Sequence, residues 1–181
     1  MSSRWIITVL GKDRPGIVAG VTKTLYQLGC NLEDSAMTRL EGEFAIMLIF
    51  SSPAKATEAV IHKAFEPLGR QMRLAVHLKP LSAQEARSPS RPGRPYLISV
   101  YGADRPGIVF RVSEALAGAG INISDVHTHR SATGGPSLYL MLLEVAVPSR
   151  MSLDTLEKRL KTLGKTLGVE VSLRSAEANV L

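Results

Sequence analysis

The sequence predicts an α+β protein made of two similar halves, each an antiparallel sheet of four strands covered by two helices. An internal repeat is the first reason: residues 6–34 and 97–125 align without a gap and are identical at 14 of 29 positions. About two identities would be expected by chance, at ~7% per position. The order of apolar patterns within each copy is the second reason, and a proline-rich segment between the copies is the third.

Each copy begins with a short strand and a helix. The expected strands, 5–10 and 96–101, are rich in Ile, Val and aromatic residues. The Asp-Arg-Pro-Gly turns at 13–16 and 104–107 predict helix starts, because proline is tolerated in the first helical turn and aspartate can cap free N–H groups. Apolar residues then recur at helical spacing, and Gly29 and Gly120 stand where a helix C-terminal glycine belongs.

A hairpin, a second helix and a last strand complete each copy. The hairpin strands are expected at 31–40 and 44–50 in the first copy, and at 121–131 and 137–147 in the second. The second helices are expected at 54–68 and 152–167, and the last strands at 72–79 and 169–174. The resulting βαββαβ order is that of the ferredoxin-like arrangement.

The repeat divides the chain into two domains, 1–80 and 96–181. Between them, residues 81–95 hold three prolines, three serines and little apolar content, which is typical of a linker. Exposed edge strands would allow the domains to pair side by side, with a ligand bound between them. We expect pairing of the two domains within the chain and a homodimer of whole chains.

Composition and charge limit the possible classes of protein. The formal net charge of +6 is the sum of +3 in the first domain, +2 in the linker and +1 in the second domain. Because the charge is spread in this way, no basic face for nucleic acid is indicated. The longest apolar runs hold six residues, far short of the ~20 of a membrane span. The single cysteine, Cys30, cannot form an internal disulfide, which favours a reducing cytoplasm.

No catalytic motif is present, and we expect neither an enzyme nor a cofactor. The sequence has no Gly-x-Ser-x-Gly elbow, no phosphate-binding loop and no dinucleotide fingerprint. Asp125, His127 and His129 alternate along one expected strand and would share a face, as metal ligands could. The first copy has Asp34, Ala36 and Thr38 there, so solvated or interface histidines are favoured and no metal site is predicted.

The turn before the first helix of each copy is the best candidate binding site. Glycine there lets a ligand approach the backbone, and a helix N-terminus suits a carboxylate. Aspartate could accept a hydrogen bond from an ammonium group, and an asparagine amide offers both a donor and an acceptor. A purely structural use of these residues, as turn and helix starts, explains them equally well. The candidate ligand-binding residues are Gly11, Asp13, Gly16, Asn31, Gly102, Asp104, Gly107 and Asn122.

These motifs resemble the ACT domain, a regulatory module that usually responds to amino acids. The similarity rests on Gly-x-Asp-Arg-Pro-Gly-Ile-Val after a strand, followed by Gly-x-Asn, and it covers both copies. The stretch 29–35, then Gly42-Glu43-Phe44, is similar to the glycine cleavage system transcriptional repressor family. That resemblance implies control of an operon through a DNA-binding activator, without direct contact to nucleic acid.

Three functions follow from the resemblance. The first is a non-enzymatic regulator that binds a small amino acid, with glycine as the expected effector, and modulates a transcriptional activator by protein contact. The second is an amino-acid-sensing regulatory subunit of a metabolic enzyme. The third is a dimerisation module without a ligand. The glycines and asparagines that are kept in both copies weigh against this third function. Lys12 in the first turn becomes Ala103 in the second, so the two sites need not bind alike.

Overall fold

A computed structural model describes residues 3–82, 93–131 and 137–176. Within these ranges the chain forms two compact units, one built from the elements before the linker and one from those after it. The first unit consists of β1 (Ser3–Lys12), α1 (Ile17–Gln27), β2 (Asn31–Leu40), β3 (Glu43–Ser52), α2 (Glu58–Met72) and β4 (Ala75–Leu81). The second consists of β5 (Arg94–Ala103), α3 (Ile108–Gly118), β6 (Asn122–Ser131), β7 (Leu138–Val147), α4 (Leu153–Leu167) and β8 (Val169–Ser175).

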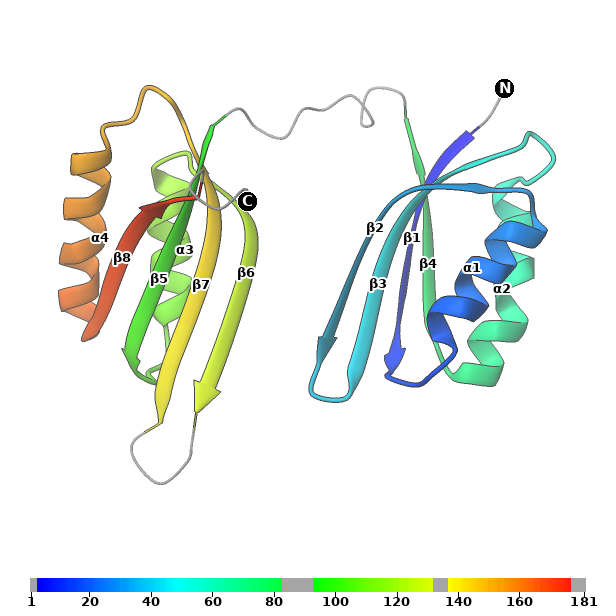
Figure 1. The fold of residues 1–181 in the computed structure, drawn as a ribbon, viewed down its shortest axis with the longest axis horizontal. Helices are drawn as coiled ribbons and strands as arrows, with labels where there is room; N and C mark the ends of the chain where they lie inside the picture. The colour runs from blue at the N-terminus through cyan, green and yellow to red at the C-terminus, as the bar shows by residue number, and fades with distance from the viewer. Residues whose placement is uncertain (1–2, 83–92, 132–136, 177–181) are drawn as a thin grey trace. The chain divides into compact units, whose positions relative to one another are not determined.

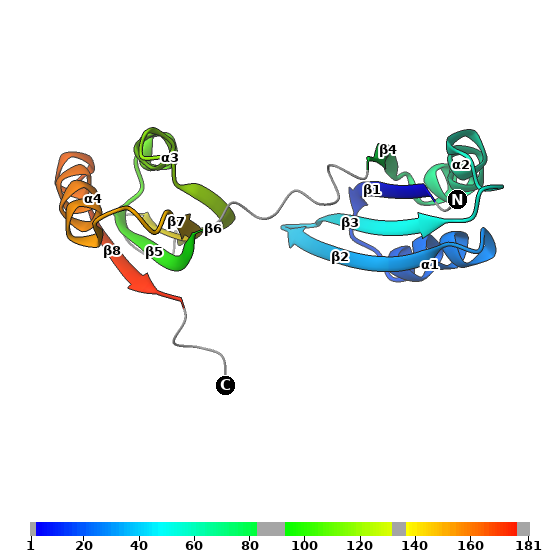
Figure 2. The same cartoon turned by 90° about the horizontal axis from the view of Figure 1, so that it is seen from above.

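Both units have the predicted ferredoxin-like fold. The strand orders are β2-β3-β1-β4 and β6-β7-β5-β8, and every pairing is antiparallel. In each unit both helices lie on the same face of the sheet (Figures 1 and 2). The domain boundaries at 80 and 96 stay a prediction, because most of the expected linker lies outside the described residues.

Alternation along the strands places the core between sheet and helices. Trp5, Ile7 and Val9 of β1 are buried, and they face the buried side of α1, where Ile17, Val21 and Leu25 recur at helical spacing. The second unit repeats this packing, with Ile98 and Val100 of β5 and with Ile108, Val112 and Leu116 of α3.

One buried polar pair stabilises the core of the first unit. The indole Nε1 of Trp5 donates a hydrogen bond to Ser52 Oγ at 2.9 Å, and Ser52 Oγ in turn donates to the carbonyl of Ala56 at 3.3 Å. Both polar groups are therefore satisfied, although Trp5 and Ser52 are buried.

Several expected boundaries were wrong by a few residues. Helix α1 begins at Ile17, after the Asp-Arg-Pro-Gly turn rather than inside it, because Gly16 has a left-handed backbone. Helix α2 begins at Glu58, not at 54, and continues past Pro67 to Met72, where Arg73 ends it in a left-handed conformation. Strand β4 consequently starts at Ala75.

The predicted helix ends at Gly29 and Gly120 are confirmed. Their φ angles are +73° and +69°, in the left-handed region that terminates helices. Helix α4 lies within one residue of its expected start, with Ser152 as the N-cap that accepts a hydrogen bond from the Thr155 amide at 3.4 Å.

Candidate functional site

The turn between β1 and α1 ends in a glycine with a left-handed backbone conformation, which other residues adopt only at a cost. Gly16 precedes the helix with φ +95°, and Gly107 has the same φ in the second unit. A side chain in this region costs about 1–2 kcal/mol. Among the residues that the structure describes, none has an atom within 4 Å of a Cβ built at either glycine, so the described part of the chain leaves the space beside both turns open.

The N-termini of α1 and α3 have no side-chain cap. The N-cap residues, Gly16 and Gly107, have no side chain that could accept a hydrogen bond from the first amides, and neither helix has an acidic residue in its first turn. The first N–H groups of a helix have no intrahelical partner and carry a partial positive charge. Both helices therefore present unneutralised donors that suit an anionic group.

Asp13 and Asp104 attach the turns to the neighbouring hairpins. We expected their carboxylates to be able to cap the helices, and the structure corrects this. Asp13 Oδ2 instead accepts from Arg39 Nη1 at 3.2 Å, and Asp104 Oδ2 lies 3.7 Å from Arg130 Nη1. Their backbone amides donate to the carbonyls of Gly42 and Ser137.

At Gly11 and Gly102, the space that a side chain would occupy is filled by other atoms of the protein. A Cβ at Gly11 would lie 2.7 Å from Leu74 Cδ2 and 3.1 Å from the Arg73 carbonyl. A Cβ at Gly102 would lie 3.0 Å from Val169 Cα. The missing side chain is thus explained by close packing of the first strand against the start of the last strand. The role of both glycines in binding stays a prediction.

An open groove of about 570 Å³ lies beside the first turn. It contains two of the predicted site residues, Asp13 and Gly16, and it is formed by the turn, the first two turns of α1 and the ends of β2 and β3. The lining residues are Asp13, Arg14, Pro15, Gly16, Ile17, Val18, Ala19, Thr22, Met37, Arg39 and Phe44.

The structure does not bring Asn31 to this groove. Asn31 is the first residue of β2, and it lines a second hollow of about 520 Å³ with Tyr26, Cys30 and Leu32, near the C-terminal end of α1. Helix α1 has 11 residues and is about 16 Å long, and this length separates the hollow at Asn31 from the turn. Ala19 and Thr22 line both hollows, which therefore continue into one another between α1 and β2.

Strand β2 is exposed along its whole length because no helix covers it. All ten residues of Asn31–Leu40 are exposed, although the partners of Leu32 and Met37 on β3, Phe50 and Ile46, are buried. Met37 is 59% exposed. On the helix side of β2, Leu32 and Met37 thus expose apolar surface near α1, next to the polar Ser35 and Arg39, and no sequence motif marks this surface.

Burial affects two titratable groups near the candidate sites. It raises the pKa of the Cys30 thiol, which leaves less thiolate at neutral pH. Burial is also the main reason that the pKa of Tyr139 is raised. A hydrogen bond with the Thr128 side chain lowers this pKa, and the charge of Asp104 raises it further.

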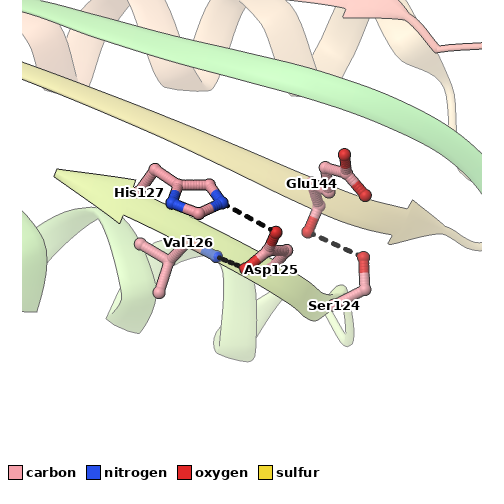
Figure 3. Close-up of polar contacts among 5 residues, drawn as sticks. All are labelled: Ser124, Asp125, Val126, His127 and Glu144. Atoms are coloured by element: carbon pink, nitrogen blue, oxygen red, sulfur yellow. Dashed lines mark hydrogen bonds and ion pairs between the residues drawn. The ribbon is translucent and has the colours of Figure 1, made fainter. Parts of the chain in front are cut away.

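The histidines of β6 lie on the helix-free face of their sheet. Asp125, His127 and His129 are paired with Glu144, Leu142 and Leu140, so they share one face as predicted. Figure 3 shows the 3.0 Å contact between His127 Nε2 and Asp125 Oδ2, whose Oδ1 accepts from the Val126 amide. Within the described ranges, no three His, Cys, Asp or Glu side chains could together hold a metal ion.

The comparisons with known proteins agree with this fold. A family model described as ACT domain matches residues 3–79 and 94–174. The chain is 26% identical to the glycine cleavage system transcriptional repressor of Escherichia coli K12 over 174 residues, 93% of this chain and 87% of that one. It is 39% identical to a UPF0237 protein of Streptococcus mutans over 74 residues, 41% of this chain and 84% of the other.

A crystal structure of a protein of unknown function from Galdieria sulphuraria has the same fold. It superimposes with a TM-score of 0.80 at 28% identity, covering 97% of this chain and 99% of that one. In the part of the chain that the structure describes, no helix is long and apolar enough to cross a membrane. Because the family model matches both units, we conclude that the chain belongs to the ACT domain family and carries two ACT domains.

Proposed function

We propose that the protein is a regulator that binds an amino acid at the turn before α1 and transmits its presence to a partner protein. The observation that carries this proposal is an uncapped helix N-terminus that opens onto a groove of about 570 Å³. Small-molecule sites are typically concave, mostly apolar and supplied with a few polar groups, and this groove has that composition.

The groove offers a complementary group to each charge of an amino acid. The free amides of the first turn of α1 would receive the carboxylate, and the arginine side chains of Arg14 and Arg39 add positive charge at the same end. The Asp13 carboxylate, half-buried beside Gly16, would accept from the ammonium group. We assign the site to binding rather than to catalysis.

Regulation through another protein is the second part of the proposal. The relative in Escherichia coli is a transcriptional repressor by name. The charge of this chain is spread over both domains and the linker rather than gathered for nucleic acid. We infer that a cytoplasmic protein of this kind acts by contact with a DNA-binding activator.

The exposed edge of β2 supports the expected side-by-side pairing of ACT domains. This strand has a hydrogen-bonded neighbour on one side only, and a long unpaired edge is a template for another strand. Homodimer formation stays a prediction. Light scattering that shows only a monomer at micromolar concentration would exclude it.

A thermal-shift screen over the twenty amino acids tests the binding step. A ligand at 100 times its dissociation constant adds about 2.7 kcal/mol to stability, enough to raise the melting temperature by several degrees. Gly42→Ala is a suitable control variant, since a Cβ there meets no atom within 4 Å. If no amino acid shifts the melting temperature, the proposal fails.

A pull-down with and without the effector then tests the partner. Recovery of a DNA-binding activator, in an amount that changes with the effector, is the expected result. Recovery of a metabolic enzyme instead would mean that the protein is a regulatory subunit of that enzyme.

A further inference from the structure

The groove of the first domain and the matching residues of the second domain differ on the helix side. Gly16 and Gly107 are equivalent in the repeat, so Ala19 of α1 corresponds to Phe110 of α3. Ala19 lines the groove and leaves it open. Phe110 is 58% exposed, and the Arg111 guanidinium lies 5.3 Å from its ring centre. A phenyl ring thus occupies the helix face where the first domain has only a methyl group.

The strand side of the groove differs in polarity. Met37 and Phe44 form this wall in the first domain, and their equivalents in the hairpin register are Thr128 and Tyr139. Thr128 and Tyr139 are joined by a hydrogen bond between their side chains. Apart from the arginine that both domains have at this position, Arg39 and Arg130, the wall is apolar in the first domain and carries two hydroxyl groups in the second.

Two apolar side chains that line the groove of the first domain are exposed. Met37 is 59% exposed and Val18 is 42% exposed, on opposite sides of the groove. Glycine has no side chain to cover either residue. An aliphatic side chain would bury both, and the flexible thioether of Met37 can adapt to its shape.

From these contacts we propose that the groove of the first domain binds an amino acid with an aliphatic side chain, such as leucine, valine or methionine, in preference to glycine. Ala19 and Met37 are the residues that determine this specificity. The inference rests on the proposed function, since it names the class of effector bound at the same site. It also assigns aliphatic binding to the first domain rather than to the second.

Calorimetric titration of the full chain with glycine, alanine, valine, leucine and methionine tests the proposal. Affinity should rise from glycine to leucine by about fourfold for each added methylene, the ratio that corresponds to 0.8 kcal/mol. If glycine binds as tightly as leucine, the inference is overturned while the proposed function stands. If no amino acid gives heat at two temperatures and none shifts the melting temperature, the proposed function itself fails.

Single substitutions test which residues determine the preference for an aliphatic side chain. Ala19→Phe, which introduces the residue of the second domain, should weaken leucine binding at least tenfold, whereas Phe110→Ala should leave it unchanged. The buried Trp5 reports by its fluorescence whether Ala19→Phe is folded. Met37→Thr changes an exposed residue, so it keeps the test valid if Ala19→Phe fails to fold. It should weaken leucine binding and leave glycine binding unaltered. Equal loss for both ligands, or loss only in Phe110→Ala, would refute the assignment.

Discussion

Replacement of Gly11 by alanine should destabilise the first domain even when no ligand is present. The added Cβ would lie 2.7 Å from Leu74 Cδ2 and 3.1 Å from the Arg73 carbonyl; Arg73 and Leu74 connect α2 to β4, and Leu74 is buried in the core. Overpacking of this kind costs about 1–3 kcal/mol. For a small domain that loses about 1 kcal/mol of stability per molar urea, the unfolding midpoint should fall by about 1 M or more.

The fluorescence of Trp5 measures this effect in one domain only. Trp5 is the single tryptophan of the chain and is 7% exposed, so its emission changes when the first domain unfolds. Gly42→Ala serves as the matched control in the same domain, because its Cβ would meet no atom within 4 Å and its φ is not positive. If both variants unfold at the wild-type midpoint, the packing explanation of Gly11 is refuted, and close approach of a ligand becomes the better one.

Three further results are expected. Gly16→Ala should lower the stability of the first domain by about 1–2 kcal/mol through backbone strain at φ +95°, and an unchanged urea midpoint would contradict the left-handed geometry. Asp13→Asn should change stability by less than about 1 kcal/mol, since the Arg39 partner is 69% exposed, but should weaken effector binding in a calorimetric titration. The Cys30 thiol should be alkylated at pH 8 more slowly than free cysteine, because burial raises its pKa; an equal rate would argue against that burial.

The fold was predictable because two independent periodicities agree with the repeat. Residues such as Ile7 and Val9 alternate along a strand, and Ile17, Val21 and Leu25 follow a helix, in copies that match at the same spacing. The boundaries of α2 were less predictable. Proline inside a helix is disfavoured, yet α2 continues through Pro67 to Met72.

The wall of the groove could not be predicted because a β-bulge determines it. The register of β2 shifts between Leu32 and Asp34, and only after this shift do Met37 and Arg39 face the helix side. One residue of slip exchanges the two faces of a strand, and no motif in the sequence marks the bulge. The separation of Asn31 from the turn likewise depends on how α1 lies over the sheet.

Nuclear magnetic resonance of the ¹⁵N-labelled chain, titrated with leucine and with glycine, tests the central claim most directly. The amide of each residue in Gly16–Ala19 reports binding at the turn, and Met37 reports contact with the strand wall. We expect leucine to shift these amides in a saturable manner, and glycine to do so only at higher concentration. Amides that stay unchanged at the turn with every amino acid, or that shift only elsewhere in the chain, would contradict amino-acid binding at this site.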